Sequence, residues 1–429
     1  RTGEGSEVRQ ELENPARTDE ISTYALQRIA LVTAFPPGRG DLSEYGFQLA
    51  RVLQESYGLQ PTIFADLHNG PAEELSGYNV IRCWRFNSIV SFAKLVMAIR
   101  RAQPDVVWFN IGLSTMANKP LPAIVSSAVP WLLHFLGFNT HVTLHAFSEN
   151  VDFDHAGVPF PALYRFGARL ATRLLLMTDG VHVLLPSYKE KLVDVFGPVG
   201  QRVFVHPHGV FQFEPEVIAV ERSPGVILAF GSWGTYKRLE GLMEAFPIVR
   251  AQFPAAQLWI AGGDHPKARG YLDECARKSA GSADISFLGY IEEQYVAALF
   301  QSVSVAVLPY SSSAGSSGVV HFACEYEVPV LASDIPDLRE LAASEGLWLE
   351  FFAPGDTNAL AEQLLRLLRD AELRREIARH NRAAIRSLSL QRIVGDYLQI
   401  FAGGRRSAER GTVEAPESAT EEASSTRAI

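Results

Sequence analysis

The stretch VILAFGSWGTYKRLEGLMEAF, from Val226 to Phe246, decides the fold of the second half of the chain. It begins with an apolar run of strand length, passes through glycines at Gly231 and Gly234, and continues with apolar residues at three- and four-residue intervals. This pattern predicts a strand, a loop and a helix that starts at about Lys237. Such a unit can cradle an anion, because glycines let backbone N–H groups approach a phosphate and a helix start carries partial positive charge. Lys237 would add a full charge; the alternative is that the glycines only make a tight turn.

Composition describes an ordinary globular protein. The 429 residues are more than one hydrophobic core normally holds, so we expect two domains. The net charge of -9 argues against a nucleic-acid partner, which would need a basic face. The three cysteines (Cys83, Cys275 and Cys324) show no paired spacing, which indicates a reducing compartment and no zinc knuckle. We therefore expect a cytoplasmic protein.

Two segments bear on membrane contact. The apolar stretch from Leu121 to Phe138 is interrupted by a proline, a histidine and a glycine, so we expect a buried helix rather than a membrane span. The helix expected from Ile89 to Arg101 carries Lys94, Arg100 and Arg101. A peripheral contact at the inner face of a membrane stays open, although a solvated helix face explains these charges equally. The first 25 residues are polar and contain no signal-peptide core.

Strand and helix patterns alternate along the rest of the chain. Strand candidates of the first half are residues 28–34, 61–66, 79–84, 105–110, 141–147, 181–186 and 202–207. After a polar, proline-bearing break the rhythm restarts with strands at residues 226–231, 257–263, 284–289, 303–309, 328–333 and 347–351, and a long helical region runs from Glu372 to about Phe401. Strands that alternate with helices predict parallel sheets covered on both faces.

We therefore predict an α/β protein of two facing, doubly wound, Rossmann-like domains with a ligand-binding cleft between them. The expected units are a disordered segment (residues 1–27), an N-terminal domain (28–212), a linker (213–224), a C-terminal domain (225–380), a helix that packs back on the N-terminal domain (381–402) and a disordered tail (403–429).

Polar residues at strand ends are the candidate site of the N-terminal domain. Gly38 and Gly40 follow the first strand and could approach a phosphate or a sugar, or could simply form a turn before a helix capped by Asp41 or Ser43. His145 ends the strand HVTLHAF, where side chains of this architecture face the cleft. The acidic loop after it has no recognised metal-ligand spacing, so we expect no metal.

The C-terminal domain offers a second anion cradle. The strand VSVAVLP is followed by a serine- and glycine-rich loop, and a helix opens near Gly318. The amides of Ser316, Ser317 and Gly318 would form an anion nest, or the loop is flexible and its serines only cap the helix. Two cradles in one domain suggest a diphosphate. His321 and Glu325, four residues apart on one helix face, could meet ribose hydroxyls or pair with each other.

The ordered set of these motifs resembles glycosyltransferase family 4, retaining nucleotide-sugar-dependent enzymes of GT-B fold. The resemblance runs from Arg28 to Phe401. It is carried by the opening stretch and by PPGRGDLSEYGFQLARVL, HVTLHAF, VFVHPHGV, QLWIAGG, DISFLGYIEEQYVAALFQSVSVAVLP and VPVLASDIPDLREL. It implies that Lys237 binds the donor diphosphate, that His145 is the active-site histidine and that Gly289, Tyr290 and Ile291 form the nucleobase-binding turn.

Three departures from the family pattern stand out. The phosphate-binding arginine is Ser232 here, and the glycine before the Pro-Val segment is Glu327. The paired glutamates of the family fall at Ala314 and Phe322, so both carboxylates are missing in this register. His321 or Glu325 could replace the second carboxylate, and only the hydroxyls and amides of the serine loop could replace the first.

The resemblance implies a retaining glycosyltransferase. A sugar would pass from a nucleoside-diphosphate sugar, bound by the C-terminal domain, to an acceptor hydroxyl of a glycan, a lipid-linked compound or a small molecule, bound by the N-terminal domain. No metal and no further cofactor would be needed. The missing carboxylates favour an alternative, a nucleotide-sugar-binding scaffold or activator without catalysis. A third reading is another GT-B chemistry, such as nucleotide-sugar epimerisation.

Overall fold

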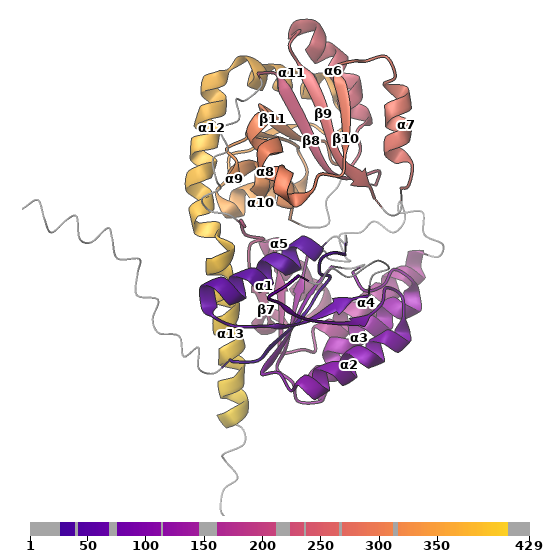
Figure 1. Ribbon diagram of the computed structural model, residues 1–429, viewed down its shortest axis with the longest axis vertical. Coiled ribbons are helices and arrows are strands. Elements are labelled where there is room, and N and C mark those ends of the chain that lie inside the picture. Colours follow the sequence, from indigo (N-terminus) through magenta and orange to yellow (C-terminus); the bar gives the residue numbers. More distant parts are fainter. Residues whose placement is uncertain are drawn as a thin grey trace, which may run out of the picture.

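The molecule has two domains that lie one after the other along its long axis, and each contains a parallel sheet with helices around it (Figure 1). The computed structural model describes residues 26–38, 42–67, 75–112, 115–145, 161–211, 224–235, 237–265, 268–311 and 316–410. This architecture confirms the predicted pair of doubly wound domains. The linker predicted at residues 213–224 lies, except for its last residue, outside the described residues, as does most of the predicted disordered segment and tail.

The N-terminal domain holds a seven-stranded sheet in the order β3-β2-β1-β4-β5-β6-β7. Its elements are β1 (Ile29–Val32), α1 (Ser43–Tyr57), β2 (Thr62–Asp66), β3 (Asn79–Trp84), α2 (Ile89–Ala102), β4 (Val106–Ile111), α3 (Pro120–Phe135), β5 (Thr140–Leu144), α4 (Pro161–Leu175), β6 (Gly180–Val183), α5 (Pro186–Phe196), η3 (Gly200–Arg202) and β7 (Val203–Val205).

Alternating side chains of β1 explain why both faces of this sheet are covered. Ile29 and Leu31 pack in one core with α1 and the C-terminal helix. Ala30 and Val32 point the other way, into a core shared with α2 and α3. Every residue of β1 is buried, as expected for a central parallel strand.

The C-terminal domain repeats the plan with six strands in the order β10-β9-β8-β11-β12-β13. Its elements are β8 (Val226–Trp233), α6 (Glu240–Gln252), β9 (Gln257–Asp264), α7 (Tyr271–Lys278), β10 (Ile285–Gly289), α8 (Glu293–Ser302), β11 (Val305–Leu308), α9 (Gly318–Glu325), β12 (Val330–Ser333), α10 (Pro336–Glu345), β13 (Glu350–Phe352) and α11 (Thr357–Arg369). The opening stretch thus forms the central strand β8 and its crossover helix α6.

The long helical region expected from Glu372 to about Phe401 consists of α12 (Ala371–Ala384), η4 (Ile385–Leu388) and α13 (Leu390–Arg410). In Figure 1, α12 runs along the C-terminal domain and α13 continues beside the N-terminal domain. Ile393, Tyr397 and Phe401 of α13 are at most 2% exposed in the N-terminal core. Burying each such side chain contributes about 1.5–3 kcal/mol, so α13 fastens the two domains together.

Several element ends differ from the prediction. β8 continues through the expected glycine loop to Trp233, and α6 begins at Glu240 rather than Lys237. α13 continues past residue 402, where we expected the folded part to end. Leu26, expected in the disordered segment, is 3% exposed and belongs to the N-terminal core.

The apolar stretch from Leu121 to Phe138 does form a helix, α3, but the expectation of a buried helix is wrong for one side of it. Leu121 and Phe135 are 62% and 74% exposed. Val129 and Leu133 are buried on the opposite side. Within the described ranges, no helix combines the length and the apolar character needed to cross a bilayer.

Candidate functional site

Both sheets reverse their strand order in the middle, and the predicted site residues follow the strands at these points. The reversal lies between β1 and β4 in one sheet and between β8 and β11 in the other. The helices after two such strands turn to opposite faces, which leaves room for a ligand at the carboxyl ends of the strands. Gly38 follows β1, Lys237 follows β8 and Ser316 follows β11, while His145 follows β5, the strand beside β4.

The glycines of the first anion cradle lie at the end of a strand and in the turn after it. β8 pairs with β9 as far as Trp233 opposite Asp264. Gly231 and Gly234 have φ of +154° and +105°, which L side chains rarely adopt. The facing Gly262 is needed for close approach, because a Cβ there would lie 1.8 Å from the carbonyl oxygen of Gly231. The backbone requires these glycines whether or not an anion binds.

Lys237 contacts the segment that follows β11. It lies in the turn after β8, where its carbonyl oxygen accepts the N–H of Gly234 at 2.9 Å. Its backbone pairs with Tyr310 at the end of β11, and its Nζ lies 4.8 Å from the centroid of the Tyr310 ring. The ring face attracts the ammonium group and holds it at the switch point. Ser232, half-buried on β8, occupies the place where the resemblance led us to expect an arginine.

The second cradle is the N-terminus of α9. Ser317 precedes the helix and is 6% exposed, but its side chain does not cap the helix. Among the described residues, the buried hydroxyl oxygens of Ser316 and Ser317 have no hydrogen-bond partner. A buried polar group without a partner costs about 1–3 kcal/mol. Two such hydroxyls beside the amides of a helix start are therefore suited to an anion.

His145 is held by a chain of hydrogen bonds across the N-terminal sheet. Its Nε2 lies 2.6 Å from Oδ1 of Asn110, and Nδ2 of Asn110 donates to Oγ1 of Thr33 at 3.0 Å. Burial lowers the pKa of His145 to about 3, so the ring is neutral near pH 7. Because an amide oxygen only accepts, the hydrogen bonding assigns the proton to Nε2 and leaves Nδ1 as an acceptor. His145 can thus orient a hydroxyl group but cannot supply a charge.

Sequence reasoning missed His208, which connects the two halves of the site. Its ring centroid lies 4.7 Å from that of Tyr45 and 6.0 Å from that of His145. On its other side the ring stacks on His321 of α9 at 5.1 Å. A Cβ on Gly318 would lie 3.6 Å from Nε2 of His208. His208 therefore lies between His145 of the N-terminal domain and the start of α9.

The protonation of His208 follows from its surroundings. Burial, then the neighbouring histidines, lower its pKa well below the ordinary value. Nδ1 lies 3.1 Å from the carbonyl oxygen of Gly209 and donates to it, so Nε2 is an acceptor. A polar residue beyond the carboxyl end of a parallel strand was the signal that pointed to His145. The same signal in VFVHPHGV could have found His208.

The two residues predicted to meet the ribose are buried and have protein partners. His321 and Glu325 are each 2% exposed. Nε2 of His321 lies 2.7 Å from Oε2 of Glu345, and Oε1 of Glu325 accepts the N–H of Phe211 at 2.5 Å. Burial favours neutral His321, but the carboxylate of Glu345 outweighs it and raises the pKa of His321. These contacts hold α9 in place, and neither the carboxylate of Glu325 nor the imidazole of His321 faces open space.

The predicted nucleobase turn lies at the edge of the C-terminal sheet. Gly289 ends β10 with φ of +70°, Tyr290 is 58% exposed and Ile291 packs against the core. In the N-terminal loop, Gly38 accepts the hydroxyl of Ser43 at its carbonyl oxygen. Ser43 is the first residue of α1 and makes no side-chain cap.

The structure accounts for two of the three departures in physical terms. Phe322 packs its ring among Phe211, Phe230 and Phe300, so an apolar contact occupies the place of a family carboxylate. Glu327 adopts φ of +57°, the left-handed region that favours glycine. Ala314, Gly40 and Asp41 lie outside the described residues, as does the acidic loop after His145.

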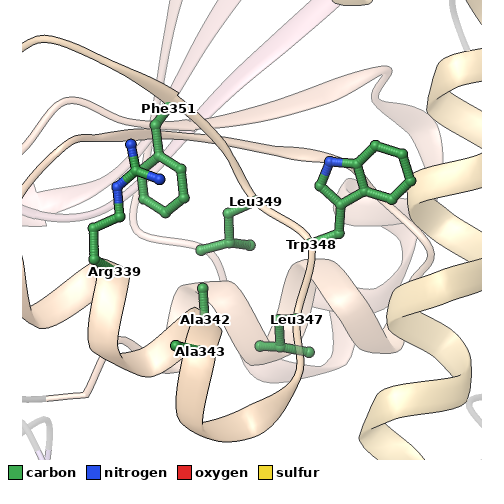
Figure 2. A pocket seen from close by; sticks show the side chains of 7 residues that line it. All are labelled: Arg339, Ala342, Ala343, Leu347, Trp348, Leu349 and Phe351. Atoms are coloured by element: carbon green, nitrogen blue, oxygen red, sulfur yellow. The ribbon is translucent and has the colours of Figure 1, made fainter.

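A separate hollow of about 500 Å³ lies between α10 and β13 (Figure 2). It is lined by Arg339, Ala342, Ala343, Leu347, Trp348, Leu349 and Phe351. The guanidinium of Arg339 stacks 3.8 Å from the centroid of the Phe351 ring and pairs with Asp334. No predicted site residue lines this hollow, so we do not assign the site to it.

Parts of the chain are similar to known glycosyltransferases. Residues 224–370 match the family model described as glycosyl transferases group 1. An uncharacterized glycosyltransferase of Methanocaldococcus jannaschii is 25% identical over 261 residues, which are 56% of this chain and 65% of that protein. The phosphatidyl-myo-inositol mannosyltransferase of Mycobacterium leprae is 25% identical over 44% of this chain and 49% of its own length. The chain thus spans less than two-thirds of either relative.

Solved structures share the fold over most of the chain. Sucrose-phosphate synthase of Thermosynechococcus elongatus has a TM-score of 0.65 at 18% identity, covering 90% of this chain and all of that one. HepE of Anabaena, solved with UDP and glucose, has a TM-score of 0.64 at 14% identity, covering 90% of this chain and 99% of its own. The chain therefore has the GT-B fold, and its residues 224–370 match the model of glycosyl transferases group 1.

Proposed function

We propose that the protein is a retaining, metal-independent glycosyltransferase of family 4. It transfers a sugar from a nucleoside-diphosphate sugar to an acceptor hydroxyl, and it works in the cytoplasm. The observation that carries this proposal is the pair of buried, unpartnered hydroxyls of Ser316 and Ser317 at the start of α9. The next residue, Gly318, lies beside His208, whose ring in turn faces that of His145. An anion-binding helix start next to a neutral, hydrogen-bonding histidine suits a diphosphate leaving group attached to a sugar.

In this proposal the C-terminal domain binds the donor. Lys237 and the amides of Ser317 and Gly318 neutralise the charge that develops on the departing diphosphate. The edge turn at Gly289 to Ile291 receives the nucleobase. HepE, which shares the fold, was solved with UDP, and this supports a nucleoside diphosphate as the donor's leaving group. His321 and Glu325 serve by fixing α9 rather than by touching the ribose, because both are buried with protein partners.

The N-terminal domain supplies the other side of the reaction. His145 orients a sugar hydroxyl through Nδ1, which has no partner among the described residues, while Asn110 fixes its ring. The neutral ring excludes a charged role, and no pair of carboxylates of glycosidase type is required. The acceptor proton would go to the departing diphosphate oxygen on the same face of the sugar. Gly38 lies at the edge of this region, where the acceptor would enter.

A donor screen tests the proposal. UDP-, GDP- and ADP-sugars are added to the full chain, and thermal stabilisation and nucleotide release are measured together. We expect one donor to raise the melting temperature and to be consumed, and the anomeric configuration of the product to match that of the donor. Inversion of the anomeric centre would contradict the retaining assignment. Absence of any stabilisation would contradict the donor site itself.

The apolar packing of Phe322 favours a second candidate, a nucleotide-sugar-binding scaffold or activator without transfer. With no carboxylate at this position, and Ser232 in place of an arginine, fewer charged groups stabilise the donor. Loss of one charged contact typically costs about 1.5–3 kcal/mol. The same screen separates the two candidates, because the scaffold predicts stabilisation without sugar transfer or hydrolysis.

A further inference from the structure

Three neighbouring helices of the N-terminal domain present large hydrophobic side chains to solvent. α3 packs against both α2 and α4, and the three lie together on one side of the domain (Figure 1). We call their outer surface the apolar–basic face. Its exposed hydrophobic residues are Ile89, Val90 and Met97 of α2, Leu121, Leu132 and Phe135 of α3, and Leu163, Phe166 and Leu170 of α4.

This exposure is too concentrated to be incidental. Single exposed hydrophobic residues are normal, but a contiguous patch on a globular protein marks a site of interaction. Val90, Phe135 and Phe166 are 71%, 74% and 66% exposed, so their side chains are open rather than half covered by neighbours. On α4 the spacing of Leu163, Phe166 and Leu170 places them on one side of the helix.

The charges on the same helices are all positive. α2 carries Lys94, Arg100 and Arg101, and α4 carries Arg165, Arg169 and Arg173, all of them exposed. No aspartate or glutamate occurs in the sequences of these three helices, although the whole chain has a net charge of -9. At the end of α3, the side chain of His134 pairs with the carboxylate of Asp179. Basic charge is thus concentrated on the face that exposes apolar groups.

This combination discriminates between possible occupants. A symmetric contact with a second copy would bring two sets of basic residues together, which is unfavourable. A nucleic acid would match the charge but would leave the phenylalanines and leucines unused. An anionic bilayer uses both, because its head groups attract basic residues while apolar side chains enter the boundary of the acyl chains.

We propose that the apolar–basic face docks on the surface of an anionic lipid bilayer. The helices lie on the bilayer, with Phe135 and Phe166 inserted below the head groups. The basic residues of α2 are those that the sequence already suggested for a membrane contact. They form one edge of this face, and α3 and α4 form its apolar centre. The docking surface is independent of sugar transfer, so its test does not depend on the proposed donor.

Flotation with lipid vesicles tests the proposal. The full chain is mixed with vesicles of phosphatidylcholine containing about one-third phosphatidylglycerol, and with vesicles of phosphatidylcholine alone. We expect the protein to float with the anionic vesicles and to be released at about 1 M salt, where the Debye length is only about 3 Å. Failure to float with anionic vesicles at low salt would overturn the proposal.

Two variants locate the contact. Phe135→Ser with Phe166→Ser removes apolar area that the fold does not bury, and we expect at least about tenfold weaker binding. Lys94→Gln with Arg101→Gln removes two charges and should weaken binding about 25-fold, since each charge near the surface contributes about fivefold. Tyr295→Ser, at a 59% exposed position of the C-terminal domain, is the matched control and should bind like the wild type.

Other results would contradict the assignment. If the phenylalanine variant bound anionic vesicles as strongly as the wild type does, the face would not touch lipid. A wild-type dimer in light scattering that becomes monomeric in this variant would show that the face is a contact between copies. Circular dichroism checks that each variant is folded. If the phenylalanine variant is unfolded, the charge variant on α2 decides, and unchanged binding by it would overturn the proposal.

Discussion

A buried group of three histidines should make the protein unstable in weak acid. His141 of β5 and His182 of β6 lie with Nδ1 and Nε2 3.1 Å apart, and His206 follows β7. The ring of His206 stacks on Tyr397 of α13 at 4.2 Å. The group therefore lies beneath the helix that fastens the C-terminal end of the chain to the N-terminal domain.

The magnitude follows from the pKa values. Burial lowers the pKa of His141, partly opposed by Asp179, and of His206 from 6.5 to about 4 in each case. The unfolded chain thus binds protons at a higher pH than the folded chain does. The stabilising effect of the neutral rings is complete above pH 6.5 and is lost as the pH falls towards 4. Protonation of each histidine lowers the free energy of unfolding by up to about 1.4 kcal/mol per pH unit. The two together therefore lower it by about 2 kcal/mol between about pH 6 and 5.

Urea denaturation at several pH values measures this loss. His206→Phe keeps an aromatic ring against Tyr397 but cannot be protonated. We expect the free energy of unfolding of His206→Phe to fall by about 1 kcal/mol less than that of the wild type between about pH 6 and 5. His380→Gln, at an exposed position, is the control and should follow the wild type. Equal pH dependence of the wild type and His206→Phe would refute the reasoning.

Three further predictions concern single contacts. Asn110→Ala removes the acceptor that fixes His145, so we expect kcat/KM in the donor assay to fall about tenfold or more. His145→Gln should have a similar effect. Full activity of Asn110→Ala would contradict this orienting role. Glu327→Gly relieves a left-handed backbone and should raise the free energy of unfolding by up to about 1 kcal/mol in urea, whereas a loss would show that the conformation is not strained. Glu340→Ala removes the carboxylate that accepts both the N–H and the hydroxyl of Ser187, so we expect a loss of about 1–2 kcal/mol in thermal denaturation, and an unchanged melting temperature would contradict this contact between the domains.

The sequence was sufficient for the architecture because apolar runs and helix periods repeat over the whole chain. VILAFG could be recognised as a strand, but its true end at Trp233 could not, because the glycines looked like a loop. Pairing with β9 extends the strand to Trp233. That pairing depends on Gly262, whose lack of a side chain lets the two backbones approach. Such a contact between distant segments leaves no local pattern.

The candidate site was also only partly predictable, because some of its contacts join distant segments. His145 and Ser317 could be singled out because each follows a predicted strand, and strand ends share one edge of a sheet. Spacing on α9 suggested that His321 and Glu325 were accessible. Their partners, Glu345 and the N–H of Phe211, come from segments that only the folded chain brings near. His208 was missed although its position after a strand carried the same signal as His145.

The most direct test of the account is calorimetric titration of nucleoside diphosphates into the wild type and Lys237→Ala. We expect one of UDP, GDP and ADP to bind the wild type. The variant should bind it about 10- to 150-fold more weakly, since one charged contact is worth about 1.5–3 kcal/mol. Arg238→Ala is the neighbouring control, because Arg238 is exposed and pairs with Glu240. Equal affinities of the wild type and Lys237→Ala, or no binding of any of the three nucleotides, would contradict the central claim that this switch point holds a donor diphosphate.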